Sequence, residues 1–218
     1  MFIYRADNAP LLVDMPTPES ALIYPGTCMF EGTSVSEGRG STRPFEVSTE
    51  WNALAFARYV KILIVHTQLL GATFTNTTWS ETMRSLEIPY ANFRFACFSP
   101  TTSKFMSQTV CGLQSYISLD SPCDYASFDP VYLGVSLLWT AKKLYSVSGN
   151  DSGYGNTTGS FHWIFNTDET DLYDVDVLTG GTLVREGIET GLSPDDIRSA
   201  WEDELSEFKK KRQSYLLY

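Results

Sequence analysis

Apolar residues recur at helical spacing in three long stretches of the chain, and this pattern predicts three long helices. The first runs from Ser48 to about Leu70, where Gly71 is placed to end it. The other two begin at Asp129-Pro130 and Ser193-Pro194, because a capping residue there precedes a proline at the first helical position. Their apolar faces are Leu133, Leu137, Leu138, Ala141 and Leu144 in the second helix and Ile197, Trp201, Leu205 and Phe208 in the third.

Two weaker patterns complete the helical prediction. Thr179 is expected to cap a short helix that ends at Gly191. The terminal "YLLY" is too apolar for a solvated tail, so it is expected to pack against the rest of the chain.

Shorter apolar runs bounded by turn residues are typical of strands. Pro25-Gly26 is expected to form a turn between the first two of these runs. The predicted strands are "ALIY" (21–24), "TCMFE" (27–31), "NFRFACF" (92–98), "TVCGLQSYISL" (109–119) and "FHWIF" (161–165). Strands mixed with helices, without regular βαβ alternation, indicate an α+β fold with a small mixed or antiparallel sheet. Residues 1–20 are interpreted as an extended lead-in or interdomain remnant, and residues 21–218 as a single α+β domain.

Composition and charge narrow the classes of function. Apolar residues make up 43% and aromatic residues 14% of the chain, which is typical of a folded globular protein. The net charge of -10 would repel a phosphate backbone, so a nucleic-acid partner is not expected. No apolar run reaches the roughly 20 residues of a membrane span, and Arg5 and Asp7 stand where a signal peptide would need apolar residues.

The cysteines and histidines do not form a metal-binding pattern. Cys28, Cys97, Cys111 and Cys123 include no C-x-x-C pair, and the chain has two histidines. We therefore expect neither a zinc site nor any other metal or cofactor. The even number of cysteines permits disulfides, but the interpretation as reduced core residues is favoured over disulfide bonding.

The segment Tyr24–Glu46, "YPGTCMFEGTSVSEGRGSTRPFE", is rich in glycine, hydroxyl and charged residues. It matches neither a phosphate-binding glycine motif nor the G-x-S-x-G nucleophile elbow. Arg39 stands between Gly38 and Gly40, so its guanidinium could bind the carboxylate of a sugar acid with two hydrogen bonds. The alternative is a compact loop whose polar groups satisfy one another, and composition alone slightly favours it.

The run "ALIYPGTCMFEGTSVSEGRGSTRPFE" resembles the signature of the bacterial exo-β-N-acetylmuramidases of the NamZ type, once catalogued as a domain of unknown function. Four later blocks are similar to that family in the same order, so the resemblance covers about residues 16–218. These blocks are "FSPTTSKF", "CGLQSYISLD", "DVLTGGTLVREGIETG" and "SPDDIRSAWEDELSEFKKKRQSYLLY".

The resemblance implies a two-part enzyme with a Rossmann-like N-terminal half, an α+β C-terminal half and a cleft between them. This chain resembles the second half, with the Rossmann-like half absent. The glycine-rich segment would form one wall of the cleft, and Arg39 would hold the lactyl carboxylate of terminal N-acetylmuramic acid. The chain departs from the family at four places: Ser34 replaces Asn, Ser41 replaces Thr, "VSTEW" replaces "GAP", and Tyr116 replaces His.

Glycoside hydrolysis normally requires two carboxyl groups, and the candidates are Glu31 and Glu46. Either carboxylate could instead cap backbone amides or pair with Arg39 or Arg43. Lys104 could face the cleft, although a lone lysine is more often solvated. The candidate substrate-binding residues are Thr33, Ser34, Ser36, Gly38, Arg39, Gly40, Thr42 and Lys104. His162 and Trp163 could stack on a sugar, but an aromatic strand is more often part of the core.

Two functional hypotheses follow. The first is the cleft-forming domain of a peptidoglycan-sugar glycosidase that releases terminal N-acetylmuramic acid and depends for activity on an N-terminal catalytic domain or a protein supplying it. The second is a non-catalytic module that binds muropeptides or a protein partner. The resemblance implies an extracellular or periplasmic location, while no signal peptide is readable in the chain.

Overall fold

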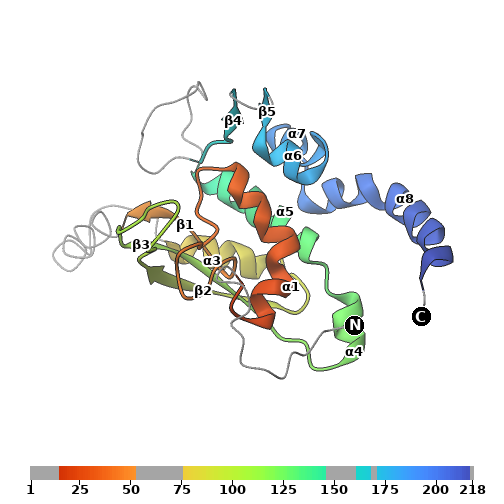
Figure 1. The fold of residues 1–218 in the computed structure, drawn as a ribbon, viewed down its shortest axis with the longest axis horizontal. Helices are drawn as coiled ribbons and strands as arrows, with labels where there is room; N and C mark the ends of the chain where they lie inside the picture. Colours follow the sequence, from red (N-terminus) through yellow and green to blue (C-terminus); the bar gives the residue numbers. More distant parts are fainter. Residues whose placement is uncertain (1–14, 53–75, 146–160, 168–170, 217–218) are drawn as a thin grey trace.

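The computed structural model describes residues 15–52, 76–145, 161–167 and 171–216. These residues form an α+β fold in which a small sheet and a group of helices share one apolar core (Figure 1). The elements before residue 120 are α1 (Pro18–Thr27), the 3₁₀ turn η1 (Cys28–Gly32), β1 (Val47–Asn52), α3 (Asn76–Ser85), β2 (Ala91–Phe98) and β3 (Val110–Ile117). They are followed by α4 (Pro122–Ser127), α5 (Pro130–Tyr145), β4 (Phe165–Asn166), β5 (Leu172–Tyr173), α6 (Asp174–Thr179), α7 (Leu183–Glu189), α8 (Pro194–Arg212) and the 3₁₀ turn η2 (Gln213–Tyr215).

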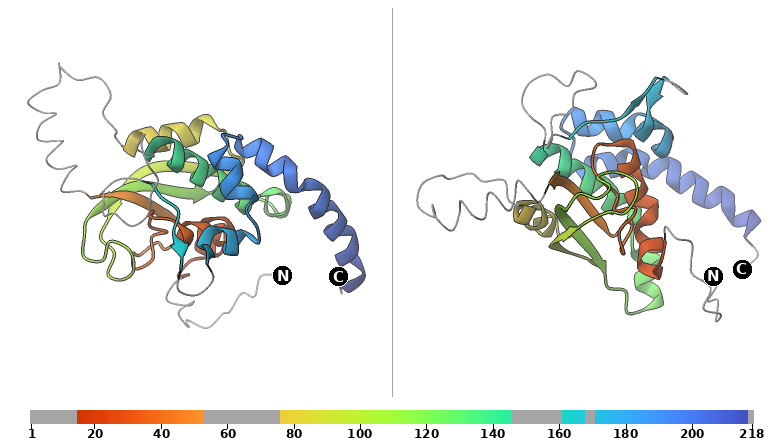
Figure 2. Two further views of the ribbon diagram at one scale, coloured as in Figure 1. Left: turned by 90° about the horizontal axis from the view of Figure 1, so that it is seen from above. Right: turned by 60° about the vertical axis from the view of Figure 1, so that its left-hand side comes forward.

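The main sheet has the order β1-β3-β2 and is antiparallel throughout. Helix α3 packs against β2 and β3, α5 packs against α3, and α1 packs against α5. Figure 2 shows the sheet on one side of this helical group and α6 to α8 on the other. The buried side chains Phe93 and Leu113 of the sheet join Trp79, Leu133 and Leu137 of the helices in one core.

The first two predicted strands are wrong, because the chain is helical from Pro18 to Gly32. Thr17 caps α1 through its hydroxyl, which accepts a hydrogen bond from the Ser20 amide at 3.0 Å, and Pro18 occupies the first turn. The Pro25-Gly26 pair lies inside the end of this helix instead of in a turn. The predicted extended lead-in of residues 1–20 therefore ends before Pro18, and its first fourteen residues lie outside the described part.

Three other expectations are corrected. Residues 48–52 of the first predicted helix belong to strand β1, which pairs with β3, and the rest of that helix lies outside the described residues. The helix expected to begin at Thr179 begins instead after Thr182, as α7, and Thr179 is the last residue of α6. Tyr215 and Leu216 are 77% and 49% exposed and do not pack as predicted, and the other two residues of the terminal "YLLY" lie outside the described residues.

The strands β2 and β3 and the helices α5 and α8 confirm the sequence-based prediction. Ser193 and Asp196 form a reciprocal capping box at the start of α8, which explains why this boundary was readable from the sequence. The Tyr132 hydroxyl of α5 donates to Asp195 Oδ1 of α8 at 2.8 Å and joins the two helices. Burial of this phenol raises the pKa of Tyr132 to about 12, and the hydrogen bond to Asp195 contributes a smaller part of the same shift.

The preference for reduced cysteines is wrong for one pair, because Cys97 and Cys111 form a disulfide. The two residues lie directly opposite each other in the β2–β3 register. Cys28 and Cys123 are free thiols. The disulfide closes the connection between β2 and β3, which carries Lys104.

The crossing of α1 and α5 depends on two glycines. A Cβ on Gly26 would overlap the carbonyl oxygen of Pro130, and a Cβ on Gly134 would overlap the backbone of Gly26. The two backbones therefore approach more closely than any larger side chain would permit. This contact places η1 and the glycine-rich segment that follows α1.

We predict that Gly26→Ala lowers the free energy of unfolding by about 2–3 kcal/mol, because the methyl group would force the two helices apart. Gly181→Ala is the matched control, since a Cβ at that position would meet no atom within 4 Å. Urea unfolding of both variants tests the expectation. Equal stability of the two variants would contradict the close helix crossing.

Candidate functional site

The glycine-rich segment is organised around an ion pair between the buried carboxylate of Glu37 and the partly buried ammonium of Lys104. The Lys104 Nζ donates to Glu37 Oε2 at 3.1 Å and to the carbonyl oxygens of Phe30 and Val35 at 2.8 and 3.0 Å. The side chain of Glu37 is 2% exposed. Because an ammonium group has three donors, these contacts account for all of them. Desolvation by burial lowers the pKa of Lys104, while the nearby Glu37 carboxylate opposes that shift.

Arg39 extends this ion pair toward the surface. Its Nη2 donates to Glu31 Oε1 at 3.0 Å, and its Nε lies 3.6 Å from Glu37 Oε1. The side chains of Arg39 and Glu31 are 31% and 36% exposed, so this pair is accessible while Glu37 is not. The guanidinium also lies over the ring of Phe45, with its Cζ 5.5 Å from the ring centroid. We call Glu31, Glu37, Arg39 and Lys104 the charge cluster.

Gly38 and Gly40 shape the backbone on both sides of Arg39. Both have positive φ values, 81° and 82°, which L side chains rarely adopt. A Cβ on Gly38 would meet Val47 at 2.5 Å, and one on Gly40 would meet Thr102 at 2.5 Å. Thr101 donates its backbone N–H to the Gly40 carbonyl at 2.8 Å, so the β2–β3 connection closes directly over this turn. The two glycines therefore fix the direction in which Arg39 leaves the backbone.

Glu46, the second candidate catalytic residue, belongs to a different hydrogen-bonded group. Its Oε1 accepts from the hydroxyls of Thr17 at 2.7 Å and Ser20 at 2.8 Å, and its Oε2 pairs with Arg43 at 3.2 Å. The side chain is 3% exposed. These contacts attach the glycine-rich segment to the start of α1. A catalytic role for Glu46 stays a prediction, and its observed contacts are those of a structural carboxylate.

Several of the predicted substrate-binding hydroxyls are used inside the loop. The Thr33 hydroxyl donates to the Phe30 carbonyl at 2.9 Å, and Ser36 Oγ accepts from the Gly38 amide at 3.0 Å. Both residues are buried. The Ser34 amide donates to the His162 carbonyl, and the His162 amide donates to Ser34 Oγ. Beside these bonds, Thr33 and Trp163 form an isolated antiparallel β-bridge. Thr42 is exposed.

The aromatic candidates differ in exposure. Trp163 is buried and packs edge-on against Phe161, in agreement with the core interpretation, whereas His162 is exposed beside Ser34. The strand expected at residues 161–165 is not continuous. Trp163 forms an isolated β-bridge, and the next strand, β4, begins at Phe165. The residue that sequence reasoning left out of the candidate list is Glu37. Its only signal was its place among the charged residues of the glycine-rich segment.

A second polar group lies on the sheet near Tyr116. Gln114 Oε1 accepts from Arg94 Nη2 at 2.9 Å and from the Tyr116 hydroxyl at 2.9 Å. Arg94 also lies over the Tyr116 ring at 4.9 Å. Gln114 is paired with Val47 in the strand register and is next to Ser115, whose amide donates to the Glu46 carbonyl at 2.8 Å.

Within the described ranges, no three His, Cys, Asp or Glu side chains are placed to hold a metal ion together. In the same part of the chain, no helix has the length and apolar character needed to cross a membrane.

Comparison with known proteins decides the family. The family model for the C-terminal part of exo-β-N-acetylmuramidase NamZ matches residues 22–62 and 66–218. The chain belongs to this family. It is also 34% identical, over 206 residues, to the peptidoglycan β-N-acetylmuramidase NamZ of Bacillus subtilis (strain 168). The fold is similar to the crystal structure of a DUF1343 family protein from Bacteroides fragilis, with a TM-score of 0.65 at 18% identity.

These relatives are much longer than the matched region. The alignment covers 94% of this chain but 39% of the Bacillus subtilis protein, and the structural match covers 96% of this chain but 44% of the Bacteroides fragilis chain. The similarity therefore establishes the family and the fold of this region.

We predict that Lys104→Met lowers the free energy of unfolding by about 3–5 kcal/mol, because it leaves the Glu37 carboxylate buried without its ammonium partner. Lys210→Met controls for the substitution itself, since Lys210 is exposed on α8. Urea unfolding gives both values. A double variant, Lys104→Met with Glu37→Leu, should recover a large part of the loss. Additive losses in the double variant would contradict the pairing.

Proposed function

We propose that this chain is the sugar-binding C-terminal part of an exo-β-N-acetylmuramidase, and that the charge cluster contacts terminal N-acetylmuramic acid. Membership of the NamZ C-terminal family supports the proposal. The Bacillus subtilis relative is named a peptidoglycan β-N-acetylmuramidase, which supports the same class of substrate.

The observation that carries the proposal is the accessible Arg39–Glu31 pair beside the buried Glu37 carboxylate, which Lys104 also binds. The cluster contains two carboxylates and two cations, so its formal charges balance. Arg39 is held from the buried side by Glu37, and Glu31 is its exposed partner. A guanidinium fixed in this way presents a planar edge to a ligand without first having to become ordered.

A lactyl carboxylate can bind by taking the place of Glu31 on Arg39. This exchange keeps one carboxylate on each side of the guanidinium, so the charge balance around Arg39 is unchanged. It also moves the Glu31 carboxylate away from its ion pair and toward the bound sugar. Glu31 is thus the better placed of the two candidate catalytic carboxylates, whereas Glu46 is fully engaged at the start of α1.

The other candidate residues take supporting roles in this proposal. Lys104, Thr33 and Ser36 hold the loop, and Gly38 and Gly40 set its turns. Ser34 and Thr42 are accessible enough to donate hydrogen bonds to a sugar.

We predict that Arg39→Lys weakens the binding of N-acetylmuramic acid by about 1–3 kcal/mol, because lysine keeps the charge but loses the planar two-point contact. Binding of N-acetylglucosamine, which lacks the lactyl carboxylate, should change little. Calorimetric titration of both sugars against the wild-type chain and the variant measures the difference.

Arg43→Lys is the matched control for Arg39→Lys. Arg43 is in the same segment but pairs with Glu46, outside the charge cluster, so this variant should bind both sugars like wild type. Equal losses for the two sugars in Arg39→Lys would assign Arg39 to loop architecture. No loss for either sugar would remove Arg39 from the site.

We further predict exo-cleavage of terminal N-acetylmuramic acid from short glycans, measured as the release of a chromophore from a muramic acid glycoside. The chain is assayed alone and joined to the N-terminal part of the Bacillus subtilis relative, because it spans 39% of that protein. Glu31→Gln should abolish turnover while leaving thermal stability near that of wild type, since Glu31 is partly exposed. Glu46→Gln should chiefly lower stability.

Cleavage of internal bonds in intact glycan strands would contradict the exo-acting proposal. Sugar binding without turnover in either form would instead support the alternative function, a non-catalytic muropeptide-binding module.

A further inference from the structure

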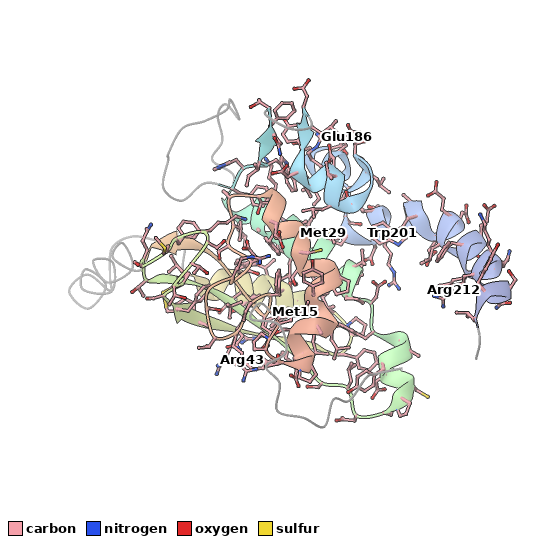
Figure 3. All side chains as sticks on the ribbon, in the orientation of Figure 1. Met15, Met29, Arg43, Glu186, Trp201 and Arg212 are labelled. Atoms are coloured by element: carbon pink, nitrogen blue, oxygen red, sulfur yellow. A yellow bond between two sulfur atoms is a disulfide. The ribbon has the colours of Figure 1, made fainter. Side chains whose placement is uncertain are left out.

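The outer part of α8, Glu202–Arg212, extends beyond the body of the protein. Every described residue from Glu202 to Leu216 is exposed, whereas Pro194 and Ile197 at the start of the helix are buried. Figure 2 shows this part of α8 running away from the remaining elements. In Figure 3, Trp201 lies near the body and Arg212 lies at the far end of the helix.

The apolar face of α8 does not stop where its contacts with the body stop. Trp201, which packs against the core, is followed on the same face by Leu205 and Phe208, which are 40% and 58% exposed. The steps from Trp201 to Leu205, Phe208 and Arg212 are four, three and four residues. This alternation is the spacing of the contact positions in a coiled coil.

The charged residues of the outer α8 are ordered in two blocks. Acidic residues occupy positions 202, 203, 204 and 207, and basic residues occupy positions 209 to 212. The basic block lies in the last turns, where it complements the helix dipole. The dipole does not explain the acidic block, because it lies in the middle of the helix.

We propose that the outer α8 pairs in antiparallel orientation with α8 of a second copy of this chain. When Leu205 packs against Phe208 of the second copy, Glu202 lies opposite its Lys209 and Glu204 lies opposite its Lys211. The two-fold relation repeats each of these pairs. A parallel arrangement would place Arg212 of each copy against Arg212 of the other at a contact position and would leave Glu204 opposite Lys209 as its one kind of Glu–Lys pair, so the charges favour the antiparallel arrangement.

The same arrangement places Arg212 of each copy against Trp201 of the other, which allows a cation–π contact at each end of the seam. The paired segment is about 16 Å long, from its eleven residues and the rise of an α-helix. This is a small interface, so the dimer should form at micromolar or higher protein concentrations.

Two charge-reversed variants of the full chain test the proposal. Glu202→Lys/Glu204→Lys makes the flanks of the seam wholly basic, and Lys209→Glu/Lys211→Glu makes them wholly acidic. In sedimentation velocity, each variant alone should dimerise at least about tenfold more weakly than wild type, because every attraction becomes a repulsion. An equimolar mixture of the two should restore dimerisation, since the charges are then opposite again.

The matched control is Asp203→Lys/Glu207→Lys, which changes the net charge by the same amount at positions away from the seam flanks. It should dimerise like wild type. All the substituted residues are exposed, and circular dichroism verifies that each variant keeps its helices.

A wild-type chain that stays monomeric at submillimolar concentration would overturn the proposal and leave this face to another occupant, such as a further segment of a longer protein. Dimerisation that is unchanged in both reversed variants would assign the contact to another surface. Failure of the mixture to dimerise would also overturn the antiparallel pairing.

Discussion

The ion pair between the buried Glu37 and the partly buried Lys104 is the constraint on which the local structure depends. The ammonium of Lys104 comes from the β2–β3 connection and binds η1, the glycine-rich segment and the Glu37 carboxylate together. A buried ion pair is favourable only when its remaining donors are also satisfied, and the carbonyls of Phe30 and Val35 meet that condition. The Cys97–Cys111 disulfide closes the connection that carries the lysine. Three separate segments are therefore held at one point.

This constraint divides the polar residues of the glycine-rich segment into two groups. Glu37, Thr33, Ser36 and Glu46 are buried and hydrogen-bonded, so they build the loop. Arg39 and Glu31 share one ion pair with solvent access. The compact-loop explanation thus applies to the buried group, while carboxylate binding by Arg39 stays a proposal. A rigid, internally satisfied loop is also what an oriented guanidinium requires, because its supporting carboxylate cannot move away.

The sequence predicted the elements whose local signals agree with their tertiary setting. Helices α5 and α8 combine a long apolar period with a cap and a first-turn proline. The apolar residues of β2 alternate in the sequence, and β3 is a short run that is buried along most of its length. Helix α1 was missed because a short apolar run with Pro25-Gly26 reads as a strand and turn, whereas Gly26 is needed for the crossing with α5. The disulfide depends on the register of β2 against β3. The Glu37–Lys104 pair joins residues 67 positions apart, and no local sequence pattern predicts such a contact.

Helix α8 shows a different limit of sequence reasoning. Its apolar period continues without interruption from Ile197 to Phe208, so the pattern predicts a single buried face. The fold supplies contacts for the first part of that face only, because the body of the protein ends near Trp201 (Figure 3). Periodicity shows which face of a helix is apolar, but it does not identify the surface that covers this face. That information has to come from a second property of the same surface. In the proposed dimer, the order of acidic and basic residues along α8 supplies it, since both Glu202 and Glu204 face lysines, and the two Arg212 side chains stay apart, when two such helices run antiparallel.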